Sequence, residues 1–325
     1  MPTEVVQQLE RTAASNSRTS KRIRIENILV PTDFSENSLK TLAYGIAMAR
    51  QFGATLSLLH IVEPTAPFTG LEAVPIVLDG NEQLSSAENR MAEFAAQHVP
   101  ADIAVTSLVR LGSAVHEISE FAKSYNIDLM IASVHPHNRV SRALFGGITE
   151  RIIHEAPCPI LIVREHEHDF FEADGAGGIR IHRILAPVDF TPCSEKALRY
   201  AVAFGQQFDA EVFCLHVVES DKPLIIMETE SYRKTHEIEA GNNMNALIRE
   251  VDGSVKFETG IVTGSPHHEI IDAADDCECD MIVIGEHCRS GVFGRFMLGS
   301  TADEVVKGAH CPVLIVRPHE HEFVR

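Results

Sequence analysis

The chain lacks the features that would place it in a membrane or outside the cell. Its 325 residues contain no apolar run near the roughly 18 residues that a membrane-spanning helix requires. The N-terminus has no apolar core of a signal peptide. The seven cysteines are odd in number and six of them follow residue 190, which does not suit a disulfide framework. We therefore expect reduced thiols, a cytoplasmic location and no membrane association.

Basic residues are also scarce. The chain has 28 Lys and Arg against 46 Asp and Glu, and its formal net charge is −18 at pH 7. Five of the basic residues lie within the first 24 residues, so the rest of the chain is more acidic still. Such a body repels a phosphate backbone, which argues against general nucleic-acid binding. A small anionic ligand stays compatible with this charge, because backbone N–H groups bind anions locally.

Recognisable catalytic and metal-binding motifs are absent as well. The sequence has no Gly-x-Ser-x-Gly nucleophile elbow and no P-loop with its lysine. The pairs His166/His168 and His319/His321 stand at matching places, but residues two apart point to opposite faces of an extended segment. We therefore predict a polar surface cluster there, no catalytic residues, and no protein metal site.

The chain repeats itself with a period of about 153 residues. Residues 28–63 and 184–219 align without gaps and are identical at 17 of 36 positions. The register returns where Asp128-Leu-Met-Ile parallels Asp280-Met-Ile-Val. A length of roughly 150 residues per domain suits two copies. The predicted parts are a disordered tail at 1–24, domains at 25–165 and 182–318, a Gly-rich linker at 166–181, and a short tail at 319–325.

Within each copy, short apolar runs alternate with segments of helical spacing. The first copy has predicted strands at 28–31, 55–61, 103–109, 129–132 and 160–163. Its predicted helices are 35–52, 86–98, 114–125 and 147–155. Alternation of this kind favours a mostly parallel sheet with helices on both faces. We predict the α/β class, with two tandem doubly wound domains.

Ligands of such sheets bind beyond the carboxyl ends of the strands, where the strand order reverses. In the second copy Asp189 closes the first strand, and a glycine-rich segment, 285–301, follows the fourth. The segment ends on Ser300 and Thr301 at the start of a helix, whose unpaired N–H groups attract an anion. This is the chemistry of a phosphate cradle. A plain helix cap is the alternative interpretation.

Four sequence features together resemble the universal stress protein family in its tandem form, over nearly all of 25–318. They are the PTDFS/PVDFT turns, the LHIVE/LHVVE strands, the glycine segment and the final CP-[IV]-LIV strands. The resemblance implies an adenine-nucleotide alpha hydrolase-like fold, and ATP in the nucleotide-binding branch. It implies that the base or ribose lies near Asp189 and the backbone of Val217. It implies that the phosphates lie near Gly285, Gly299 and Ser300, with Mg²⁺ only as the ion that accompanies ATP.

The second copy departs from the family's loop at two points. The family's loop reads Gly, two residues, Gly, nine residues, Gly, then Ser or Thr. Cys288 replaces the second glycine, and ten residues rather than nine precede Gly299. Arg289 can contact phosphates, Gly291 can compensate for the missing glycine, and Thr301 can add a hydroxyl. We predict that this copy holds the nucleotide.

The first copy departs further. Ser133 and Pro136 stand where the first two glycines belong, and Gly147 follows Gly146 where Ser or Thr belongs. Proline removes an N–H donor and restricts the backbone, which does not suit a loop that donates N–H groups. We therefore predict a degenerate site in this copy, around Asp33, Ser133, Gly146 and Gly147.

Several of these residues also have a structural interpretation. Asp33 and Asp189 precede helices, where Asp is a good N-cap. Val217 is equally explained as a packed strand residue. His60 and His216 are predicted to be buried, hydrogen-bonded strand residues rather than catalysts.

The leading hypothesis is a cytoplasmic stress-response protein that binds ATP or a related adenine nucleotide as a regulatory or structural ligand. The alternatives are a nucleotide-free interaction module and, less favoured, a slow ATPase. The final strands, 160–163 and 313–316, are predicted sheet edges, and exposed apolar edges need a cover. We predict an internal pseudo-dimer that can pair again into a homodimer.

Overall fold

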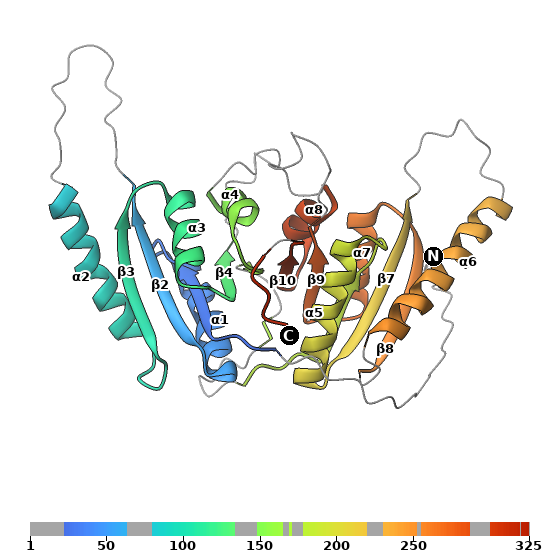
Figure 1. Ribbon diagram of the computed structural model, residues 1–325, viewed down its shortest axis with the longest axis horizontal. Coiled ribbons are helices and arrows are strands. Elements are labelled where there is room, and N and C mark those ends of the chain that lie inside the picture. Colours follow the sequence, from blue (N-terminus) through green and yellow to red (C-terminus); the bar gives the residue numbers. More distant parts are fainter. Residues whose placement is uncertain are drawn as a thin grey trace, which may run out of the picture. The chain divides into compact units, whose positions relative to one another are not determined.

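The computed structural model separates into two units, coloured from blue to green and from yellow to red in Figure 1. The N-terminal unit comprises Ile25–Glu165 and Glu320–Glu322, and the C-terminal unit comprises Met1–Arg24, His166–His319 and Phe323–Arg325. The structure describes residues 23–63, 80–133, 148–164, 169–170, 178–219, 230–251, 255–286, 300–318 and 320–324. Most of the predicted tail at 1–24 and of the linker at 166–181 lies outside these residues.

The N-terminal unit is a parallel sheet with the strand order β3-β2-β1-β4-β5. Its strands are β1 (Asn27–Pro31), β2 (Thr55–Val62), β3 (Val105–Leu111), β4 (Leu129–Ser133) and β5 (Ile160–Val163). Its helices are α1 (Glu36–Phe52), α2 (Gly80–His98), α3 (Ala114–Ser124) and α4 (Ile148–Glu155). Right-handed crossovers place α1 and α2 on one face and α3 and α4 on the other. In agreement, α3 packs against α4.

The C-terminal unit repeats this plan, with the parallel order β8-β7-β6-β9-β10. Its strands are β6 (Arg183–Pro187), β7 (Glu211–Glu219), β8 (Phe257–Gly264), β9 (Met281–Gly285) and β10 (Val313–Val316). Its helices are α5 (Pro192–Phe208), α6 (Glu230–Glu250), α7 (Pro266–Asp276) and α8 (Ser300–Gly308). The predicted α/β class with a doubly wound sheet in each copy is confirmed.

Two predicted elements in the N-terminal unit are misplaced, β3 by two residues and the start of α2 by six. Strand β3 was expected at 103–109 but spans Val105–Leu111, because Ile103 is buried in a turn where its N–H donates to the Pro100 carbonyl at 3.1 Å. Helix α2 begins at Gly80 rather than at residue 86. Its first turn carries Glu82, whose charge suits the positive end of the helix dipole, although no apolar period marks this turn.

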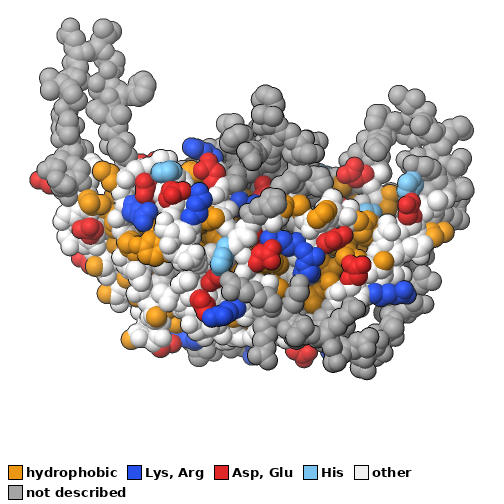
Figure 2. Space-filling model, in the orientation of Figure 1, with side chains coloured by type: hydrophobic (Ala, Val, Ile, Leu, Met, Phe, Trp, Pro, Cys, Tyr) orange, Lys and Arg blue, Asp and Glu red, His pale blue; other side chains and the backbone are white. Residues whose placement is uncertain are grey.

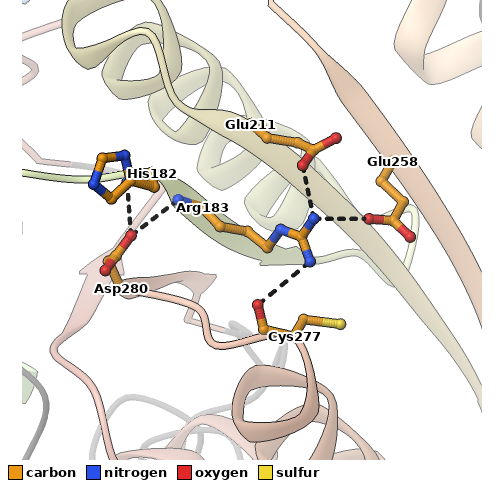
Figure 3. Close-up of polar contacts among 6 residues, drawn as sticks. All are labelled: His182, Arg183, Glu211, Glu258, Cys277 and Asp280. Atoms are coloured by element: carbon orange, nitrogen blue, oxygen red, sulfur yellow. Dashed lines mark hydrogen bonds and ion pairs between the residues drawn. The ribbon is translucent and has the colours of Figure 1, made fainter.

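A buried aspartate ties the first strand of each sheet to the fourth at their amino ends. In the C-terminal unit the Asp280 carboxylate accepts the backbone N–H groups of His182 and Arg183 at 2.6 and 3.0 Å (Figure 3). In the N-terminal unit Asp128 does the same for Glu26 and Asn27 at 2.8 and 2.9 Å. Both carboxylates are about 5% exposed or less. Each carboxylate therefore satisfies two partly buried backbone donors at the start of the first strand.

The pairing of the tied strands is short. Strand β6 pairs with β9 through two residue pairs at the amino end, whereas it pairs with β7 through five. Strand β1 shows the same difference between β4 and β2. The first and fourth strands are thus joined at one end, and their carboxyl ends are left without mutual backbone pairing. This is the switch point at which doubly wound sheets bind ligands.

Charged side chains also form ion pairs at the amino end of the C-terminal sheet. Arg183 on β6 lies 2.8 Å from Glu211 on β7 and 3.6 Å from Glu258 on β8, and it donates to the Cys277 carbonyl at 3.3 Å (Figure 3). The hydrogen bond to Glu211 raises the pKa of Arg183 above its usual value. The guanidinium therefore links three strands and the end of α7.

The end of the chain is packed into both units. Phe323 is fully buried in the C-terminal unit, with its ring 4.8 Å from Tyr200 and 6.0 Å from Phe204. In the N-terminal unit the His321 ring nitrogen Nε2 lies 2.8 Å from the Asp128 carboxylate. The His321 side chain is 34% exposed and pairs with this buried carboxylate, so the surface cluster stays a prediction. His319 and the matching pair His166/His168 lie outside the described residues.

Charged side chains of both signs occupy the described surface. Acidic and basic side chains are interspersed over the face in view in Figure 2, and the described residues there form no continuous basic patch. Across the described ranges, no helix is both long and apolar enough to cross a bilayer.

Replacing Asp280 by Ala tests the tie between β6 and β9. The variant leaves two partly buried N–H groups without their charged acceptor, so we expect a loss of roughly 2–4 kcal/mol in the free energy of unfolding. Asp276→Ala is the matched control, because Asp276 is exposed at the end of α7. Urea unfolding measures both variants, and equal stability of the two would contradict the assigned role.

Candidate functional site

The first strand of each unit ends in a tight turn built on an aspartate. In the C-terminal unit the Asp189 carboxylate accepts the N–H and the hydroxyl of Thr191, at 3.0 and 2.6 Å. In turn the Asp189 N–H donates to the Ser194 hydroxyl at 3.2 Å. The turn holds an exposed carboxylate at the carboxyl edge of the sheet, where the sequence predicted a ligand contact.

The interpretation of Asp33 and Asp189 as helix N-caps is wrong. The caps are Ser35 and Thr191, whose side chains accept the N–H of the residue three positions on. The chain turns once more before each helix, because the Phe that follows each Asp has a positive φ of about 60°. The Asp side chains stabilise this turn instead of the first helical turn.

A phenylalanine with positive φ is strained unless its surroundings hold it. The Phe190 ring lies 4.5 Å from the His216 ring. The His216 Nδ1 atom is 2.8 Å from the Val188 carbonyl. His60 has the same distance to Thr32, so the predicted hydrogen bonds of both histidines are confirmed, although the two residues are half-buried rather than buried.

The end of β9 touches the first turn of α5. A Cβ atom on Gly285 would lie 2.6 Å from the Cys193 carbonyl oxygen and 2.9 Å from the Ser194 nitrogen. No side chain fits at that distance, so packing alone requires glycine here. The same contact brings the start of the predicted loop directly beside the Asp189 turn.

Sequence reasoning missed a charged cluster at this edge. Glu286 directly follows Gly285, and its carboxylate forms an ion pair with the Arg317 Nε atom at 3.0 Å. Both side chains are 11% exposed. The Lys196 ammonium of α5 is almost fully buried and donates to the Arg317 carbonyl at 2.6 Å. These contacts fix the residues that follow β9 and β10.

The far end of the predicted loop coincides with a helix N-terminus. Ser300 is the first residue of α8, and half-buried Thr301 follows it. The first N–H groups of a helix have no acceptor within it and attract anions. On β7, Val217 is half-buried and pairs with Val262 of β8.

The middle of the predicted loop cannot be compared with the structure. Cys288, Arg289, Gly291 and Gly299 lie outside the described residues, as do Gly146 and Gly147 of the predicted degenerate site. Ser133 of that site ends β4, opposite Val163 of β5, and Asp33 forms the same turn as Asp189. Within the described ranges, no group of three or more His, Cys, Asp or Glu side chains could hold a metal ion.

Comparison with known proteins shows the family of the chain. The model of the universal stress protein family matches residues 24–164 and 180–317. The chain belongs to the universal stress protein family. The two matches are the two universal stress protein domains, each of which carries the aspartate turn.

Universal stress proteins of one and of two domains resemble the chain. The universal stress protein MJ0531 of Methanocaldococcus jannaschii is 32% identical over 145 residues, which are 43% of this chain and 84% of that protein. The universal stress protein Mb2028c of Mycobacterium bovis is 20% identical over 308 residues, which are 92% and 99% of the two chains. The crystal structure of a universal stress protein from Archaeoglobus fulgidus matches with a TM-score of 0.65 at 20% identity. It covers 93% of this chain and 99% of that one, so it shares the fold.

Replacing Gly285 by Ala tests the close approach of β9 to α5. The added methyl group forces a backbone shift, and we expect a loss of roughly 1–3 kcal/mol in unfolding free energy. Gly241→Ala on α6 is the control, because its Cβ would meet only Ile261, at 3.7 Å. Alanine suits a helix better than glycine by about 0.5–1 kcal/mol, so this control is expected to gain stability. A Gly285→Ala variant as stable as the parent chain in urea would contradict the packing argument.

Proposed function

We propose that the chain is a cytoplasmic stress-response protein that binds ATP or a related adenine nucleotide in its C-terminal domain. The nucleotide acts as a regulatory or structural ligand, and Mg²⁺ accompanies it. The base or ribose contacts the Asp189 turn and the backbone near Val217, and the phosphates contact Gly285, Gly299 and the start of α8 at Ser300. The remaining loop residues, Cys288, Arg289, Gly291 and Thr301, complete the proposed site.

The observation that carries the proposal is the convergence of three elements on one edge. The Asp189 turn touches the end of β9 through Gly285, and α8 begins at the residue where the predicted loop ends. This edge lies where β6 and β9 have stopped pairing. An exposed carboxylate can accept from a ribose or base, while helical N–H groups donate to phosphates. The arrangement supports the nucleotide that the family resemblance implies.

In this proposal, buried charged side chains hold the start of the loop in a fixed position. Glu286 and Arg317 neutralise each other at the beginning of the loop, and Lys196 holds the Arg317 carbonyl. Breaking a buried ion pair leaves an uncompensated charge, which is strongly destabilising. The residues at the start of the loop are therefore held in place, so less conformational entropy is lost when the site binds an anion.

Titration of the full chain with Mg²⁺–ATP by isothermal calorimetry tests the proposal. We expect saturable binding with one nucleotide per chain. Asp189→Ala should weaken the affinity about tenfold, because it removes a hydrogen bond to a charged acceptor. Asp33→Ala is the matched control, since it removes the same turn from the N-terminal domain. Absence of saturable binding at millimolar ATP would contradict the proposal, and so would equal effects of the two variants.

The Cys288 position favours a second candidate, a nucleotide-free interaction module, because this residue replaces a glycine of the family's loop. Cys288→Gly distinguishes the two candidates. The substitution strengthens ATP binding if the loop binds phosphates. It leaves ATP binding unchanged or absent if the chain is a nucleotide-free module. Slow ATP hydrolysis is the least favoured activity. Hydrolysis would be assigned to this site only if substitution of Gly299 abolished it.

The pairing of domains and chains is a separate part of the proposal. Two matches to one family model in a single chain support an internal pseudo-dimer of the two domains. Sedimentation of the purified chain tests the further homodimer, since one chain has a mass of 35.8 kDa.

A further inference from the structure

The N-terminal domain contains a hollow of about 420 Å³ between the end of β2 and the first half of α2. We name it the α2 hollow. Its volume lies within the range of small-molecule sites, about 300–1,000 Å³. The residues that matter for its chemistry are Phe34, His60, Val62, Glu82, Ala87 and Arg90.

The α2 hollow is distinct from the switch point of the same domain. Side chains alternate along a strand, so His60 and Val62 share one face of β2, and this is the face that α2 covers. Ser133 and the segment after it lead into α4, which lies on the other face. A ligand of the hollow would therefore sit apart from the proposed nucleotide site, which is also in the other domain.

One cation lines the hollow. The Arg90 guanidinium lies over the Phe34 ring, 4.5 Å from its centroid. Within the described ranges this is the contact that Arg90 makes, and no carboxylate there pairs with it. A guanidinium that stacks by its face keeps the N–H donors along its edge for a carboxylate.

Acceptors line the hollow as well. The His60 Nδ1 atom is 2.8 Å from the Thr32 carbonyl. A carbonyl can only accept, so Nδ1 carries the proton and Nε2 of the neutral ring is an acceptor. Glu82 adds an exposed carboxylate from the first turn of α2. A second carboxylate, Glu63, already accepts the Ala114 N–H at 2.9 Å.

Apolar surface lies among these polar groups. Val62, Ala87 and the Phe34 ring supply it. We propose that the α2 hollow binds a small zwitterion with an apolar body, the chemistry of a free aliphatic or aromatic α-amino acid. Arg90 holds the carboxylate of the ligand, Glu82 and the His60 Nε2 atom receive its ammonium group, and the side chain packs on Val62 and Ala87.

The two domains differ at this place. Phe190 of the C-terminal domain also has a positive φ and a histidine neighbour, His216. No cation lies over its ring in the part of the chain that the structure describes.

Calorimetric titration of the full chain with L-leucine, L-phenylalanine and two leucine analogues tests the proposal. Isocaproate keeps the carboxylate without the ammonium group, and isoamylamine keeps the ammonium group without the carboxylate. We expect saturable binding of at least one of the two amino acids. For leucine, each analogue should bind about tenfold more weakly. Binding should persist in the presence of saturating ATP, since the two sites are separate.

Variants of the hollow test which side chain binds the carboxylate of the ligand and which binds its ammonium group. Arg90→Met keeps an apolar chain over Phe34 and should lower the affinity for leucine to that of isoamylamine. Glu82→Gln should lower it to that of isocaproate. Arg249→Met, at an exposed position on α6 of the other domain, is the matched control and should bind leucine like the parent chain. Thermal unfolding of all three variants checks that they fold.

Four results would overturn the proposal. They are no saturable binding of either amino acid at about 10 mM, analogues that bind as well as leucine, an Arg90→Met variant with unchanged affinity, and loss of leucine binding when ATP is added. The last result would mean that the amino acid occupies a nucleotide site. The first three results do not depend on whether ATP itself binds.

Discussion

The hydrogen bonds of one buried carboxylate hold the first and fourth strands of each sheet together at their amino ends. Asp280 accepts two backbone N–H groups at the amino end of β6, and Asp128 does the same for β1. Strands that are tied at one end and pair over two residues there are free to diverge at the other end. Since both carboxylates are buried, the tie is stable in a way that surface contacts are not.

The opposite edge collects the groups that can meet a ligand. The turn after β6 exposes Asp189, Gly285 brings the end of β9 against α5, and Glu286 pairs with Arg317 behind the loop. None of these contacts needs the nucleotide in order to form. Packing, strain and charge neutralisation prepare this edge beforehand, which is the condition for efficient recognition of an anion.

The sequence was a good guide to the order of the elements, and less so to their ends and caps. The duplication and the alternation of strands and helices follow from the repeat and from hydrophobic spacing. Contacts between distant residues could not be foreseen, since Asp280 meets its N–H partners 97 and 98 residues away. The pair of Glu286 and Arg317 has no local signal either. The N-cap was misplaced because Phe190 takes a backbone conformation that glycine or asparagine usually marks.

Hydrogen exchange of the full chain with and without Mg²⁺–ATP tests the central claim most directly. The account predicts slower exchange with ATP in the turn at 188–191 and in the first turn of α8, with no change at His182 and Arg183, whose amides Asp280 already holds. The opposite pattern would contradict it: protection by ATP at His182 and Arg183, or confined to the N-terminal domain, with the carboxyl edge of the C-terminal sheet unaffected.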